Sequence, residues 1–161
     1  MQLLRADLDI IEELRKDWTD IKVIYQLRHP RGILSSRQES DKLVFPNVTQ
    51  EAVYLCQKMM RDYYMYTMLK RKYPRMMFKT TYESIMAQPA ENANTIYNFL
   101  DIPMPWYIKD WAERLSEAKP IVRSQQSENS TTSKRQVKLR PKTKAFIDTA
   151  CKGIYFGIGY K

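Results

Sequence analysis

The chain has 161 residues and a formal charge of +9 at neutral pH, from 27 lysines and arginines against 18 acidic residues. This length fits one domain with a hydrophobic core, and no segment approaches the roughly 20 apolar residues of a membrane-spanning helix. A single histidine and two cysteines argue against a zinc site. The basic excess favours an anionic partner, and a nucleotide, a sulfated glycan, nucleic acid or simply a solvated basic face each fits it.

Hydrophobic spacing predicts helices alternating with short strands. In chain order we expect a helix over Leu3–Trp18, a strand over Lys22–Leu27, a helix from Pro30 to about Ser40, a long helix with Thr49 as N-cap reaching about Arg71, a strand over Met76–Lys79, and helices over Ala90–Leu100, Tyr107–Ala118 and Pro141–Cys151. The three glycines of the ending GIYFGIGYK are expected to stop regular structure. This alternation favours an α/β architecture with a parallel sheet.

Two features bear on the cellular compartment. Cys56 and Cys151 lie in separate predicted helices, and a disulfide in an oxidising compartment and two buried free thiols are equally compatible with the sequence. The triplets beginning at Asn47 and Asn129 fit the N-glycosylation sequon, which supports a secretory location only weakly.

The strongest chemical signal is the passage from the first predicted strand into the next helix. Arg28 follows the strand, and Pro30 opens a helix whose free N–H groups and dipole favour an anion at its start. A phosphate at this edge of the sheet could take a forked contact from Arg28 and a hydrogen bond from Ser36. The alternative is that Arg28 pairs with an acidic residue and Ser36 faces water.

Residues 28–37, RHPRGILSSR, resemble the form RDPRxxxxSR of the carbohydrate sulfotransferases, especially the N-acetylglucosamine 6-O type. The resemblance implies that Arg28 and Ser36 bind the 3′-phosphate of 3′-phosphoadenosine-5′-phosphosulfate, with Arg37 assisting. His29 stands where that family usually has Asp. Donor binding need not suffer from this change, but we expect a loop contact that depends on the Asp to be lost.

Weaker matches follow in the family's order. Residues 79–85, KTTYESI, resemble a strand followed by YEDL, and residues 96–100, IYNFL, resemble a helix that follows a proline. The ending from Cys151 to Tyr160 resembles the family's C…LGY terminus. Ser133-Lys134-Arg135 resembles a basic loop near the nucleotide, so Arg135 is expected to contact the donor.

The resemblance implies an α/β, P-loop-NTPase-like sulfotransferase fold, with a parallel sheet flanked by helices. It also implies sulfuryl transfer from 3′-phosphoadenosine-5′-phosphosulfate to a sugar hydroxyl of a glycan, with no metal, no nucleic-acid partner and a lumenal site at the Golgi membrane.

No Gly/Ser-rich loop for the 5′-phosphosulfate precedes Arg28. We therefore expect residues 1–161 to form one partial domain that is incomplete at its N-terminus and inactive alone, with the catalytic base and the membrane anchor upstream. The rival interpretation is a basic domain that binds nucleic acid or sulfated glycan without chemistry, or a non-catalytic remnant.

Several further residues invite functional interpretations. His29, the single histidine, is expected to be a solvent-facing loop residue rather than a general base. Glu83 is expected to have a structural role at a strand end rather than a catalytic one. For Trp106 and Trp111, core packing is favoured over a ligand-binding platform. The same holds for six side chains of the long helix: Met59, Met60, Tyr63, Tyr64, Tyr66 and Met68.

Overall fold

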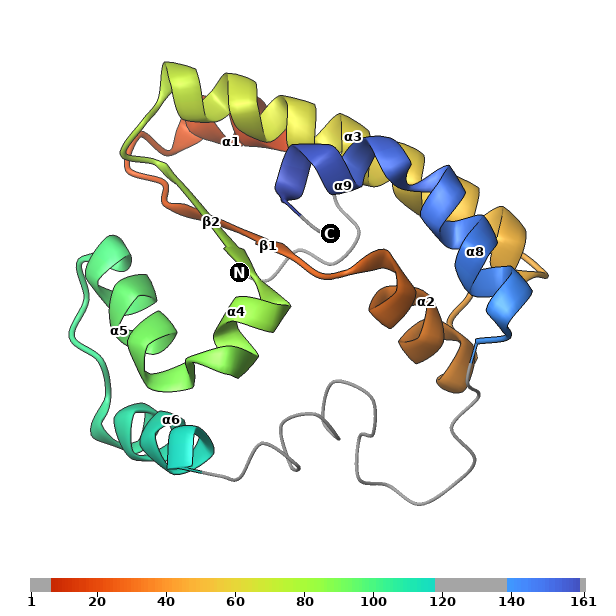
Figure 1. Cartoon of the computed structure of the whole chain (residues 1–161). Helices are drawn as coiled ribbons and strands as arrows, with labels where there is room; N and C mark the ends of the chain where they lie inside the picture. The colour runs from red at the N-terminus through yellow and green to blue at the C-terminus, as the bar shows by residue number, and fades with distance from the viewer. Residues whose placement is uncertain (1–6, 118–138, 160–161) are drawn as a thin grey trace.

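The computed structural model describes residues 7–117 and 139–159 (Figure 1). The elements in chain order are α1 (Ile10–Asp17), β1 (Val23–Leu27), α2 (Pro30–Glu39), α3 (Val48–Lys72), β2 (Met77–Thr81), α4 (Tyr82–Ala87), α5 (Pro89–Leu100), α6 (Trp106–Glu117), α8 (Pro141–Ala150) and α9 (Lys152–Ile158). The described part is rich in helix around a small parallel sheet, which confirms the expected α/β class. None of the described helices is long and apolar enough to cross a membrane.

The sheet consists of β1 and β2, which pair in parallel from Val23 opposite Met77 to Leu27 opposite Thr81. Two parallel strands need a crossover between them, and α2 and α3 form it. Because the last pair is Leu27 and Thr81, the residues that follow each strand leave the same edge of the sheet side by side. This carboxyl edge is where the candidate site lies.

Helices α2, α8 and α9 pack against α3 on one side of the molecule (Figure 1). Their main core cluster includes Leu34 of α2, Leu55 of α3 and Ile147 of α8, all buried. The helices therefore bury a continuous apolar interface, which is the main driving force for their association. A second core cluster, with Ile11 and Leu69 among its members, joins α1 to the end of α3.

A disulfide joins Cys56 of α3 to Cys151 at the end of α8. Of the two possibilities that the sequence leaves open, the structure therefore has the paired one. The bond ties together residues separated by 95 positions, so it holds the C-terminal helices against α3.

The expectation that the C-terminal glycines stop regular structure is wrong, because α9 continues through them. A Cβ atom at Gly157 would lie 2.8 Å from the Tyr63 ring, and one at Gly153 would lie 3.6 Å from Met60. Gly157 therefore lets α9 approach α3 closely, whereas the contact at Gly153 is an ordinary one. Only Gly159, with φ +78°, acts as a terminator, since it forms the left-handed C-cap.

Two predicted helix starts also differ from the structure. The N-cap of α3 is Asn47, whose Oδ1 accepts the N–H of Gln50 at 2.8 Å, so the cap is two residues before the predicted Thr49. The first helix begins at Ile10, later than predicted. Leu3 and Leu4, which carried the earlier start, lie outside the described residues.

Candidate anion-binding site

Arg28 is the first residue after β1, and its guanidinium lies over the first turn of α2. A Cβ atom at Gly32 would lie 3.1 Å from the Arg28 Nε, so only a glycine leaves full room for this side chain. On the other side, the guanidinium carbon lies 4.3 Å from the centroid of the Tyr82 ring. Such a contact is attractive through the ring's quadrupole. Arg28 is therefore held between the start of α2 and the start of α4.

The sheet register explains why these side chains meet. Each residue of β1 faces the β2 residue 54 positions later, as Leu27 faces Thr81. Continued past the sheet, the same register places Arg28 beside Tyr82. It also places His29 beside Glu83, whose Oε1 accepts the backbone N–H of His29 at 2.8 Å.

His29 is the N-cap of α2, and its Nδ1 accepts the backbone N–H of Arg31 at 3.2 Å. An Asp at this position would make the same kind of contact. The imidazole therefore supplies an N-cap acceptor at the position where the family usually has Asp. The ring is half-buried rather than solvent-facing, because it packs on Tyr155.

Burial, and next the nearby charge of Arg31, lower the pKa of His29 below its ordinary value. The imidazole is therefore neutral at physiological pH. This state agrees with the cap, because Nδ1 must keep a lone pair to accept a hydrogen bond. Glu83 has the structural contact that was expected of it.

The predicted free N–H groups at the start of α2 are not free. Pro30 has no N–H, and the His29 carbonyl accepts the N–H groups of Gly32 and Ile33 at 2.9 and 3.1 Å, beside the two contacts described above. The contribution of α2 to anion binding is therefore its dipole and its side chains. In the described part of the chain the Arg28 guanidinium has no hydrogen-bond or ion-pair partner, so its N–H donors are available to a ligand.

Ser36 lies one helical turn beyond Gly32, on the same side of α2. It is exposed, and its carbonyl accepts the N–H of Ser40 at 3.1 Å, as the helix ladder requires. The structure thus places Arg28, Gly32 and Ser36 in one row along the helix surface. Position 36 therefore lies on the side of α2 against which the Arg28 guanidinium packs.

Arg37 is turned away from this row toward α3. Its Nη1 lies 2.5 Å from Oε1 of Glu51, which is 0% exposed, and the other Glu51 oxygen accepts the backbone N–H groups of Val44 and Phe45. Glu51 thus joins α2, α3 and the loop between them. Arg135, the fourth predicted site residue, lies outside the described residues.

The predicted core position of Trp106 and Trp111 is wrong, because 78% and 56% of their surfaces are exposed. The same holds for Met60, Tyr64 and Met68 on α3, whereas Met59 is buried as expected. Both tryptophans lie on α6, which packs mainly against α5.

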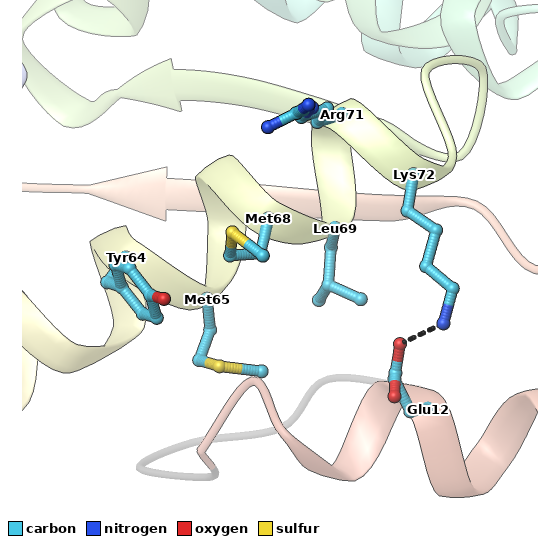
Figure 2. Close-up of a pocket in the computed structure, with 7 residues that line it drawn as sticks. All are labelled: Glu12, Tyr64, Met65, Met68, Leu69, Arg71 and Lys72. Atoms are coloured by element: carbon cyan, nitrogen blue, oxygen red, sulfur yellow. Dashed lines mark hydrogen bonds and ion pairs between the residues drawn. The ribbon is translucent and has the colours of Figure 1, made fainter.

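A cavity of about 560 Å³ lies between α1 and the end of α3 (Figure 2). Apolar side chains such as Met65 and Leu69 line it, and an ion pair between Lys72 and Glu12 spans its rim at 2.8 Å. The end of α3 adjoins the start of β2, whereas Arg28 follows the end of β1. The cavity is therefore separate from the anion-binding site.

Sequence reasoning missed three contributors to the site: Tyr82, Gly32 and the capping role of His29. Tyr82 was noted only as part of the YESI match. Arg28 and Tyr82 are each the first residue after a strand, and this could have indicated the role of Tyr82. The signal becomes informative only once the register of the two strands is known.

Comparison with known proteins adds a family to this geometry. The family model described as sulfotransferase domain matches residues 12–155. Carbohydrate sulfotransferase 1 of Mus musculus and that of Homo sapiens are each 26% identical to the chain, over 88% of it and 39% of their own length. The chain thus spans about two fifths of the curated relatives that it matches. No solved structure matches it significantly.

Proposed function

This chain belongs to the sulfotransferase family, and on that premise we propose that Arg28 and Ser36 bind the 3′-phosphate of 3′-phosphoadenosine-5′-phosphosulfate. The observation that carries the proposal is the placement of Arg28. Its guanidinium is fixed between Gly32 and Tyr82, and its donors have no partner among the described residues. A phosphate accepts forked hydrogen bonds from such a group.

The remaining predicted residues take different parts in this proposal. Arg135 is proposed to contact the nucleotide directly. Arg37 assists through its ion pair with Glu51, which fixes α2 relative to α3. The neighbouring acid Glu83 accepts the His29 N–H at the start of α2, so its charge is partly compensated there.

We propose further that the protein transfers a sulfuryl group from this donor to a sugar hydroxyl of a glycan, with the 6-hydroxyl of N-acetylglucosamine as the acceptor. The donor supplies the activated sulfuryl group, and adenosine 3′,5′-bisphosphate is the product that remains. The chain's own residues bind and orient the nucleotide, which is a large part of catalysis in reactions of this type. Support comes from the RHPRGILSSR match and from the names of the relatives.

We also propose that the protein lies on the lumenal side of the Golgi membrane and that it is glycosylated. The Cys56–Cys151 disulfide supports an oxidising compartment. The sequon at Asn47 is exposed and therefore accessible to glycosylation.

Thermal unfolding with adenosine 3′,5′-bisphosphate tests the donor site. A ligand that binds only the folded state raises the melting temperature, so we expect a rise for the wild type and its loss in Arg28→Ala. Arg114→Ala is the matched control, because Arg114 is an exposed arginine paired within α6. No rise at millimolar nucleotide, or an equal rise in Arg28→Ala, contradicts the proposal. Affinity for nucleic acid that falls steeply with salt would instead favour the rival basic domain.

A further inference from the structure

The C-terminal helices α8 and α9 contact the first turn of α2 on the side away from Ser36. Arg31 donates from Nε to Oδ1 of Asp148 in α8 at 2.7 Å, and its Nη2 contacts the other carboxylate oxygen. Two parallel contacts of this kind fix direction as well as distance. Asp148 therefore restrains the side of α2 that faces away from Ser36.

Tyr155 of α9 closes this group into a ring of contacts. Its hydroxyl donates to the same Oδ1 of Asp148 at 3.2 Å, and its ring lies 5.1 Å from the His29 ring, centroid to centroid. His29 in turn accepts the backbone N–H of Arg31. Arg31, Asp148, Tyr155 and His29 thus surround the turn against which Arg28 lies.

The ring of contacts is anchored in the core. Ile154, beside Tyr155, is 0% exposed, and Cys151, between Asp148 and Tyr155, is bonded to Cys56 of α3. The C-terminal helices are therefore tied to α3 by a covalent bond and by buried apolar contacts. Because Asp148 and Tyr155 are anchored in this way, their contacts with Arg31 and His29 fix the position of the first turn of α2 relative to α3.

We infer that Asp148 and Tyr155 are positioning residues of the donor site, which hold the first turn of α2 so that Arg28 and Ser36 are presented together to the 3′-phosphate. This inference rests on the proposed function. Neither residue needs to touch the nucleotide. Asp148 acts through Arg31, and Tyr155 acts through His29 and through Asp148.

Two consequences of removing the Asp148 charge oppose each other. Without its partner, the first turn of α2 loses a restraint, which weakens recognition of the 3′-phosphate. The same change releases the Arg31 guanidinium, which could itself attract an anion. The Arg31 side chain is 44% exposed, so its released charge is largely screened by solvent. We therefore expect the loss of position to dominate.

The test measures the preference for the 3′-phosphate, defined as the dissociation constant of adenosine 5′-monophosphate divided by that of adenosine 3′,5′-bisphosphate. For Asp148→Asn we expect this preference to fall roughly two- to fivefold, the size typical of a partly exposed ion pair. Asp110→Asn, which removes an exposed carboxylate paired with Arg114 inside α6, should leave it unchanged. Tyr155→Phe keeps the ring and removes the hydroxyl, so it should cause a smaller fall, and it supplies the test where Asp148→Asn does not fold.

The outcomes separate the inference from the proposed function. A wild type with no preference for the 3′-phosphate contradicts the proposed function. A general loss of stability would weaken both nucleotides equally and leave the preference unchanged. An unchanged or increased preference in both variants therefore overturns the positioning role. Hydrogen exchange across α2 without nucleotide tests the restraint by itself. We expect faster exchange in Asp148→Asn than in Asp110→Asn, and equal rates would overturn the inference.

Discussion

Replacing Gly32 by alanine should weaken nucleotide binding while leaving stability nearly unchanged. The new Cβ atom would lie 3.1 Å from the Arg28 Nε, closer than carbon and nitrogen normally approach. The guanidinium can yield by a few tenths of an ångström, but it then leaves its position over the Tyr82 ring. That contact is worth about 0.5–1 kcal/mol at an exposed site, which corresponds to roughly a two- to fivefold loss of affinity for adenosine 3′,5′-bisphosphate.

The same substitution favours the helix. Alanine is better than glycine inside a helix by about 0.5–1 kcal/mol, and Gly32 does not have the left-handed backbone that would oppose it. The gain offsets the weakened Arg28–Tyr82 contact, so the free energy of unfolding should stay within about 0.5 kcal/mol of the wild-type value. Urea unfolding and titration calorimetry on the same preparation measure the two effects.

Gly153→Ala is the matched control for this experiment. Gly153 is also a helical glycine, in α9, and a Cβ atom there meets Met60 at an ordinary 3.6 Å. It should change stability without changing nucleotide affinity. If Gly32→Ala binds the bisphosphate as tightly as the wild type, Arg28 is not held for phosphate binding by the first turn of α2, and the reasoning fails.

Three other perturbations follow from the same geometry. Tyr82→Leu should weaken binding of adenosine 3′,5′-bisphosphate by about two- to fivefold, whereas Tyr82→Phe, which keeps the ring face, should bind almost normally; equal losses would show that the hydroxyl matters instead. His29 is the chain's single histidine and has a lowered pKa in the folded state, so the unfolded state takes up its proton first as the pH falls below 6.5. Stability should therefore decline from pH 6.5 toward pH 5, and urea unfolding of His29→Asn should show a flatter dependence. Glu51→Ala leaves the Arg37 charge and two backbone N–H groups without their partner, so it should lower the free energy of unfolding by about 3 kcal/mol. In the control Glu39→Ala, which removes an exposed carboxylate of α2, the cost should be less than about 0.5 kcal/mol.

Local sequence signals were sufficient for most elements of the fold. The proline at the start of α2, the basic last turn of α3 and the β-branched run of β1 place these elements within a few residues of their observed limits. The position of Arg28 after β1 also follows from this pattern. These features depend on residues close in sequence, so one chain suffices to recognise them.

Features that depend on tertiary packing could not be predicted in the same way. The glycines of α9 look like helix breakers until Tyr63 of α3 is placed against Gly157. Likewise, Glu51 reads as a first-turn acid because its partner Arg37 lies on another helix. The pairing of Cys56 with Cys151 requires α3 and the end of α8 to be adjacent, which the sequence does not state.

Arg28 and Ser36 are predicted as site residues from the sequence, and the structure shows how the surroundings of Arg28 are built. The role of Tyr82 emerges only from the parallel register, and the saturated N–H groups emerge only from the hydrogen bonds of His29. Spacing along one helix is thus readable from sequence, whereas contacts between the two strand ends are not.

The central claim is that Arg28 and Ser36 together bind the 3′-phosphate of the donor. A crystal structure of the protein with adenosine 3′,5′-bisphosphate tests it most directly. We expect 3′-phosphate oxygens within about 3 Å of both the Arg28 guanidinium and the Ser36 hydroxyl, with Arg28 still against Tyr82. A nucleotide bound with its 3′-phosphate away from α2 would contradict the account.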